Sequence, residues 1–168
     1  MDPELHLEAR PPFSALGRLC LMLSSTSVLL MALVTTAEVL GRALLGISIQ
    51  VSSELGGYLL VSLAFFSFAV CQERDAFINV DFVQARLSPR GKAFSQVVFG
   101  IISIAFCAIL EFYLIRLVWR SYDSGSISAT LLYTPQWIPQ LSMPLGMAAF
   151  IISLLRTLIG NLRQLMGR

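Results

Sequence analysis

Charged residues are scarce in this chain. Lysine, arginine, aspartate and glutamate make up 13% of its 168 residues, whereas hydrophobic residues make up 56%. Because soluble globular domains carry roughly 25% charged residues, this composition excludes an ordinary soluble domain and indicates an integral membrane protein. The formal net charge of +2 is too small to indicate a nucleic-acid partner, and we expect none.

Residue types that support redox, metal or nucleophilic chemistry are equally sparse. The cysteines Cys20, Cys71 and Cys107 lie in or beside apolar stretches without forming a C-x-x-C pair, and the single histidine, His6, lies in the polar N-terminal tail. The sequence has no glycine-rich phosphate loop and no nucleophile with a histidine base. We therefore predict no catalytic residue, no metal site and no bound cofactor.

Long apolar stretches are what the chain does contain. A stretch of about 18 residues or more can cross the hydrocarbon layer of a bilayer, about 30 Å thick, as a helix. We expect four such spans, at residues 16–40, 54–72, 93–118 and 137–158. The expected fold class is an all-α integral membrane protein, with a cytoplasmic tail over residues 1–15 and a four-helix transmembrane domain over residues 16–168.

A charged segment separates the second span from the third. Residues 73–92 hold both acidic and basic side chains, and Asp81 lies on the otherwise apolar side of the helix that this segment would form. Because the amphipathic pattern is imperfect, we expect residues 75–88 to form a short interfacial helix that another protein partly covers.

The basic residues are divided unevenly between the two sides of the membrane. Nine lie in the N-terminal tail, the central segment and the C-terminal end, against Arg42, Arg116 and Arg120 on the other side. Cytoplasmic loops carry an excess of lysine and arginine. We therefore expect a multi-pass protein with both termini in the cytoplasm.

No predicted span carries a charged residue near its middle, since Glu38 and Glu111 are expected close to helix ends. A self-sufficient ion-coupled pump usually needs an ionisable group at depth. The pattern favours a helper subunit. A stand-alone small transporter and a structural or assembly subunit of an unrelated membrane complex are the alternatives.

Polar and aromatic residues near the span ends are candidates for contacts between helices or subunits. An antiparallel hairpin would place Arg42 and Glu54 at one outer level, where an ion pair and separate snorkelling to water are both open. Asp81 either pairs within its own segment or contacts a partner. Trp137 suits the membrane interface. Pro144 is expected to kink the fourth span unless that helix begins later.

A series of features follows in order along the four expected spans: Arg42, Glu54, the run ERDAFINVD at residues 73–81, the P-x-W at Pro135 to Trp137, and the P-L-G at Pro144 to Gly146. In this order, they resemble the small membrane subunit of the tripartite ATP-independent periplasmic (TRAP) transporters. The similarity covers nearly the whole chain, and one departure is Phe77, where the family often has histidine.

The resemblance implies a complex in the bacterial inner membrane. In that family a large multi-helix subunit carries substrate and sodium, and a periplasmic binding protein delivers an organic acid, such as a C4-dicarboxylate or sialic acid. The implied partners are the large subunit, which this chain would brace, the transiently docked binding protein and membrane lipids. Arg116, Arg120 and Asp123, at the periplasmic ends of the helices, are the docking candidates. This chain's sequence does not identify the transported acid, because in that family the residues that bind it lie in other chains.

Overall fold

A computed structural model describes residues 13–46, 51–74, 89–128 and 132–166. The long helices are α1 (Ala15–Leu45), α2 (Val51–Glu73), α4 (Pro89–Asp123) and α6 (Ser142–Met166), and the one-turn helix α5 (Trp137–Gln140) precedes α6. In the described ranges, β-structure is limited to an isolated bridge between Ile127 and Pro135. The expected interfacial helix at residues 75–88, with Phe77 and Asp81, lies outside the described residues.

Each long helix is apolar enough to cross a bilayer. The candidate spans are Ala15–Leu44, Val51–Glu73, Ser95–Asp123 and Trp137–Arg163, with mean hydropathies from 1.7 to 2.4. About 20 helical residues cover the hydrocarbon layer, so all four exceed the required length. The expectation of an all-helical protein with four long apolar helices is confirmed.

Local signals in the sequence set the ends of these helices. Ser14 caps α1 by accepting a hydrogen bond from the Gly17 N–H at 3.1 Å. Gly46 ends α1 in the left-handed conformation, with φ at 66°. Gly125 does the same for α4, and the next residue, Ser126, donates its N–H to the Ser121 carbonyl at 3.1 Å.

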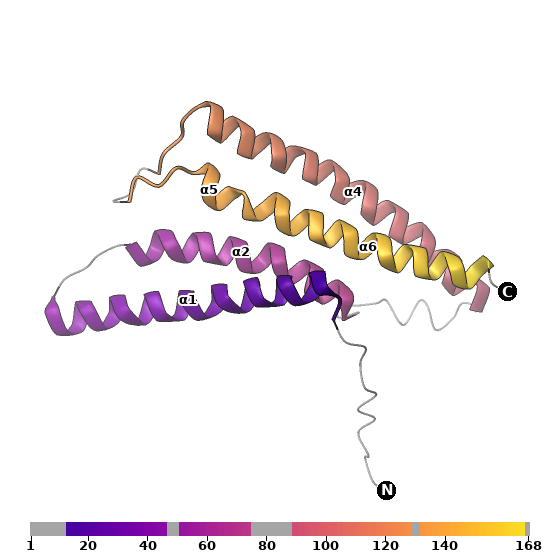
Figure 1. The fold of residues 1–168 in the computed structure, drawn as a ribbon, viewed down its shortest axis with the longest axis horizontal. Helices are drawn as coiled ribbons and strands as arrows, with labels where there is room; N and C mark the ends of the chain where they lie inside the picture. The colour runs from indigo at the N-terminus through magenta and orange to yellow at the C-terminus, as the bar shows by residue number, and fades with distance from the viewer. Residues whose placement is uncertain (1–12, 47–50, 75–88, 129–131, 167–168) are drawn as a thin grey trace, which may run out of the picture.

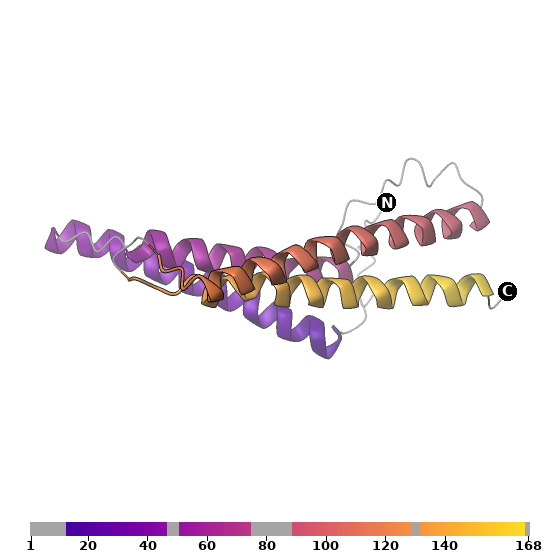
Figure 2. The same ribbon diagram turned by 90° about the horizontal axis from the view of Figure 1, so that it is seen from above.

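The four long helices lie side by side in a row, in the spatial order α1, α2, α6, α4 (Figure 1). α2 packs on both α1 and α6, and α6 packs on both α2 and α4, whereas α1 and α6 barely touch. Figure 2 shows the row nearly edge-on, with the helices crossing at shallow angles. The arrangement is a layer rather than a closed bundle, and among the described residues no further element covers either broad face of the row.

Small residues line the contacts within the row. Cys20, Ala69 and Ala149 form a buried cluster where α1, α2 and α6 meet. Nearby, Gly146 of α6 lies so close to α2 that a Cβ added to it would be 2.7 Å from the Phe65 carbonyl carbon. Lipid provides no hydrophobic driving force between helices, so close approach of this kind supplies the packing energy.

The serine-rich part of α1 packs inside the row. Ser24 and Ser27 are buried, and their hydroxyls donate to the carbonyls of Leu21 at 3.1 Å and Leu23 at 2.9 Å. Since α1 packs mainly on α2, these serines allow the first hairpin to close tightly.

Pro144 does not kink the fourth span. It is the third residue of α6, because that helix begins at Ser142. The N–H groups of the first helical turn have no partner within the helix, so the missing N–H of proline removes no hydrogen bond there. Leu141, between α5 and α6, keeps helical backbone angles, with φ at −58° and ψ at −28°.

Candidate functional site

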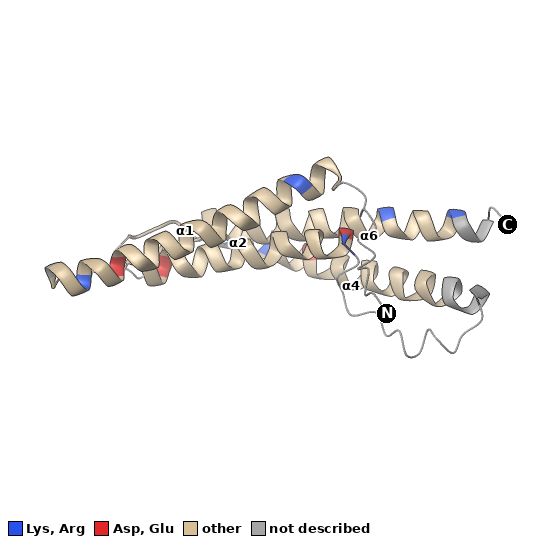
Figure 3. Cartoon of the chain, turned by 90° about the horizontal axis from the view of Figure 1, so that it is seen from below, with Lys and Arg blue, Asp and Glu red and all other residues tan. Residues whose placement is uncertain are grey.

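Charged residues gather near the ends of the helix row (Figure 3). We call the end that holds Glu73 the inner end and the end that holds Glu54 the outer end. Each end has its own set of polar contacts. The two sets are described in turn, followed by one acid that lies between them.

At the inner end, Glu73 connects three helices. Ser14, which begins α1, donates to the Glu73 carboxylate from its backbone N–H at 3.2 Å and from its hydroxyl. Arg156 of α6 lies 3.8 Å from the same carboxylate. The Glu73 side chain is 14% exposed and that of Arg156 is 55% exposed, so the contact to Ser14 is the better shielded of the two.

At the outer end, Glu38 ties α1 to the start of α2. Its carboxylate pairs with Arg42 at 2.7 Å and accepts the backbone N–H of Ser52 at 3.1 Å. Glu38 therefore both neutralises Arg42 and satisfies one of the unpaired N–H groups in the first turn of α2. The ion pair of Arg42 with Glu54, one of the two arrangements that the sequence left open, stays a hypothesis.

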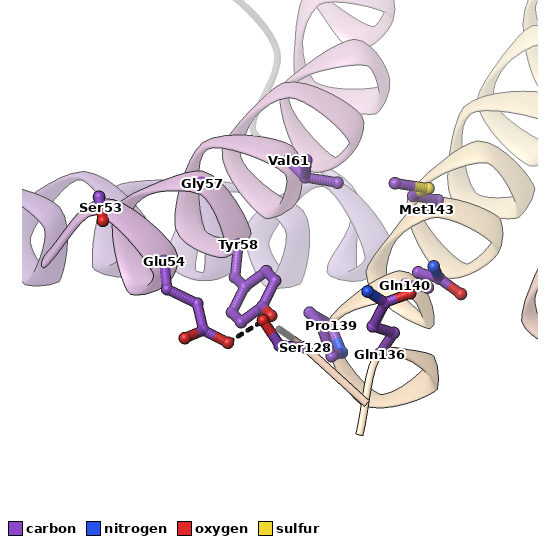
Figure 4. A pocket seen from close by; sticks show the side chains of 10 residues that line it. All are labelled: Ser53, Glu54, Gly57, Tyr58, Val61, Ser128, Gln136, Pro139, Gln140 and Met143. Atoms are coloured by element: carbon purple, nitrogen blue, oxygen red, sulfur yellow. Dashed lines mark hydrogen bonds between the residues drawn. The ribbon is translucent and has the colours of Figure 1, made fainter. Parts of the chain in front are cut away.

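A cavity of about 540 Å³ opens beside this point, between α2 and α5 with the start of α6 (Figure 4). Glu54 lies in its wall, 8% exposed, and accepts a hydrogen bond from the Tyr58 hydroxyl at 2.7 Å. Ser128, 6% exposed, lies beside that hydroxyl. The full lining is Ser53, Glu54, Gly57, Tyr58, Val61, Ser128, Gln136, Pro139, Gln140 and Met143.

The lining of this cavity combines one acidic group with neutral polar groups. The amide oxygen of Gln140 is buried and has no hydrogen-bond partner among the described residues. The lining holds one carboxylate, from Glu54, together with hydroxyl and amide groups, and it contains no lysine, arginine or histidine. The cavity thus presents hydrogen-bond donors and acceptors together with one carboxylate.

Trp137 lies on the other side of α5, toward α4. Its ring meets that of Tyr122 edge to face, with centroids 5.6 Å apart. Both rings and Pro144 line a second recess, of about 340 Å³, whose lining is entirely apolar or aromatic. This surrounding fits the expected interfacial anchor.

The docking candidates Arg116, Arg120 and Asp123 fall within about 60° of one another around α4, at 100° per residue, and all three are exposed. They differ in depth. Asp123 ends the helix, whereas Arg116 lies seven residues earlier, which corresponds to about 10 Å along the axis. Of the three, Asp123 and Arg120 are therefore best placed to reach water.

Glu111 lies deeper than its position in the sequence suggested. Gly100 of α4 lies against Leu158 of α6, and Tyr122 meets Trp137. Glu111 is midway along α4 between Gly100 and Tyr122, so it lies beside the residues midway between Leu158 and Trp137, which are 147–148. These residues directly follow Gly146, which packs on α2.

This level is far from both ends of the row. The α2 partner of Gly146 is Phe65, which precedes Glu73 by eight residues and follows Glu54 by eleven, or roughly 12 Å and 17 Å along the helix axis. The expectation that Glu111 lies near the outer interface is wrong, because the packing of α4 on α6, and not the distance along the chain from the charged segment, sets its depth. One of its carboxylate oxygens is buried without a partner among the described residues.

These features define an all-helical, multi-pass membrane protein. Residues 31–164 match the family of tripartite ATP-independent periplasmic transporters, DctQ component. The chain therefore belongs to this family of transporter components of the bacterial inner membrane, which is not an enzyme family. It is also 27% identical over 147 residues to the ectoine TRAP transporter small permease protein TeaB of Halomonas elongata, a match that covers 88% of this chain and 76% of that protein. The resemblance drawn from the sequence is confirmed.

The sequence pointed to Glu54 but not to the residues around it. Tyr58 had a signal, because residues four apart share a helical face. Ser128 and Gln140 had none, since they are 74 and 86 residues from Glu54 and only folding brings them to one cavity. The contact between Ser14 and Glu73 was missed for the same reason.

Proposed function

We propose that this chain is the scaffold subunit of a TRAP transporter. It binds one face of the large membrane subunit and braces it during sodium-coupled uptake of a small organic solute that a periplasmic binding protein delivers. Membership of the family supports the presence of these partners. The shape of the chain supports the bracing role.

The observation that carries this proposal is the open row of helices. Within the most apolar stretch of α4, only 6% of residues are buried by the rest of the chain, and for α1 and α2 the share is 17%. A layer with so little interior of its own offers two broad faces. One face can lie against a large helical partner while the other meets lipid, which suits a brace better than a closed transport path.

A reconstitution experiment tests the proposal. We expect proteoliposomes with this chain, the large subunit and the binding protein to take up solute, and uptake to fall to background when this chain is left out. Proteoliposomes with this chain alone should show no uptake. Uptake by the chain alone, abolished by Glu111→Gln, would instead support a stand-alone transporter that uses its one deep acid.

The solute class is proposed more broadly than the sequence suggested. The resemblance implies an organic acid, such as a C4-dicarboxylate or sialic acid, whereas the relative from Halomonas elongata is named for ectoine. Competition of labelled-solute uptake by a panel of both kinds of compound separates these classes. Inhibition by ectoine alone would exclude C4-dicarboxylates and sialic acid as solutes.

We also propose that the outer end of α4 contributes to docking of the binding protein. Complementary charge raises the rate of encounter and weakens with salt. Arg120→Glu should therefore lower uptake several-fold when the binding protein is limiting, and excess binding protein should restore it. Arg116→Glu, the same change about a turn deeper on the same face, should have a smaller effect. Equal uptake with the wild type, Arg120→Glu and Arg116→Glu at every concentration of binding protein would assign docking to the large subunit.

This docking proposal requires the outer end to face the periplasm, with both termini in the cytoplasm. The excess of basic residues at the other end supports that orientation. Single cysteines at Ser126 and at Arg163, each in a variant without Cys20, Cys71 and Cys107, test the orientation. The cysteine at Ser126 should react with a membrane-impermeant thiol reagent in intact cells, whereas the one at Arg163 should react only after the cells are opened.

A further inference from the structure

The helix α4 lies at one edge of the row and packs chiefly on α6 (Figure 1). Gly100 marks the packed side of α4, because a Cβ there would meet Leu158 of α6. At 100° per residue, five large side chains lie between about 180° and 260° around the helix from Gly100. They form the free stripe of α4, and each is between 57% and 67% exposed: Phe99, Ile102, Phe106, Ile109 and Tyr113.

The free stripe has the spacing of a helix-packing surface. Its successive residues are three, four, three and four positions apart, as on a helix that packs along a second helix. The helix at the other edge of the row, α1, has no aromatic residue, and its most exposed large side chains, such as Leu29 and Leu33, are aliphatic. Aromatic side chains are enriched in the cores of protein interfaces. The two edges therefore differ as expected if protein covers the edge at α4 and lipid covers the edge at α1.

Tyr113 puts a polar group on the free stripe at the middle of the row. It lies two residues after Glu111 in α4, and so about 3 Å nearer the outer end. That level is roughly 15 Å from Glu73 and roughly 14 Å from Glu54 along the helix axes, too far from either end for a tyrosine side chain to reach water. Its ring meets that of Phe112 edge to face, but its hydroxyl has no hydrogen-bond partner among the described residues. Since a hydroxyl without a partner in hydrocarbon is unfavourable, an acceptor from outside this part of the chain is needed beside it.

We propose that the free stripe of α4 packs against a transmembrane helix of the large membrane subunit, and that this helix presents a hydrogen-bond acceptor to the Tyr113 hydroxyl. The inference rests on the proposed function, which supplies that partner. Lipid is the poorer occupant, because acyl chains offer no acceptor at this depth. From Phe99 to Ile109 the stripe is uncharged and apolar, which matches the surface of a membrane-spanning helix.

The hydroxyl is tested with Tyr113→Phe. This change removes one oxygen from an exposed side chain, so the free chain should melt as the wild type does. In the detergent-solubilised complex with the large subunit, we expect the dissociation constant to rise roughly threefold or more, the effect of one hydrogen bond between membrane helices. Tyr122→Phe is the matched control, because Tyr122 is 62% exposed against 60% for Tyr113 but lies beside the outer end of α4, where water satisfies its hydroxyl. It should leave the affinity unchanged.

The packing of the stripe is tested with Ile109→Ala, which would leave a gap against the partner helix. We expect a several-fold weaker complex. Ile101→Ala makes the same change in the same helix at a side chain of similar exposure, 55% against 59%, but about 80° outside the position of Ile109 around the axis. This variant should bind as the wild type does, and an equal loss of affinity in both would show that the contact does not follow the free stripe.

A photo-crosslinker identifies what covers the stripe. The amino acid p-benzoylphenylalanine, introduced at Tyr113, should crosslink to the large subunit when membranes holding the complex are illuminated. The same amino acid at Leu29, which is 65% exposed on α1, should not. A crosslink from Tyr113 to a second copy of this chain in place of the large subunit would overturn the inference.

The outcomes separate this inference from the proposed function. If the wild-type chain forms the complex and both Tyr113→Phe and Ile109→Ala bind as tightly as it does, the free stripe faces lipid, although the scaffold role stands. If the wild-type chain does not bind the large subunit at all, the proposed function itself fails.

Discussion

Gly146→Leu is expected to prevent the two hairpins of this protein from packing together. A side chain at this position would begin 2.7 Å from the carbonyl carbon and the Cβ of Phe65, and 2.9 Å from its carbonyl oxygen. Overpacking a core typically costs about 1–3 kcal/mol. Because backbone atoms cannot rotate aside, we expect a loss at the upper end of this range, seen as a lower melting temperature and a low yield of folded protein in detergent.

Gly160→Leu provides the matched control, because it makes the same change in the same helix. A Cβ at Gly160 would meet no atom within 4 Å, so this variant should melt close to the wild type. Equal melting temperatures for the two variants would show that α2 and α6 do not approach as closely as described.

Glu73→Ala is expected to release the N-terminal end of α1 from the rest of the row. The change removes the acceptor of two hydrogen bonds from Ser14 and the partner of Arg156. Hydrogen bonds to a charged group contribute about 1.5–3 kcal/mol each, and partial exposure of Glu73 reduces that figure here. We expect a destabilisation of about 2 kcal/mol, with faster amide hydrogen exchange in the first turn of α1.

Arg156→Met is the control for the ion pair alone. The Arg156 side chain is 55% exposed and 3.8 Å from Glu73, so it should contribute less than about 1 kcal/mol. A larger effect from Arg156→Met than from Glu73→Ala would show that the ion pair, and not the contact with Ser14, holds the inner end together.

The four long helices and their apolar character could be predicted from the sequence, because a span must satisfy a length and a composition that are both local. The start of α6 was harder to predict from the sequence. Pro144 gave a signal for either a kink or a late helix start, and the structure places it as the third residue of α6. The row arrangement carries no local signal, since it depends on which helix faces meet.

The depth of Glu111 illustrates the same limit for the candidate sites. Counting residues from the charged segment places this acid near the far interface, whereas the contacts of Gly100 and Tyr122 with α6 place it near the middle of the row. The inference that the chain has no deep ionisable group was therefore wrong. The helper role now depends on family membership and on the open shape of the row instead.

The order of the helices in space has a consequence for how the protein is made. The third long helix, α4, packs chiefly on α6, which is synthesised after it. When α4 leaves the ribosome, the only finished part of the chain is the hairpin of α1 and α2, and α4 has no substantial contact with either. Within this chain, α4 therefore gains its main packing partner only when α6 is inserted between it and α2. The helix that is translated after α4 is thus the one that joins the two halves of the row.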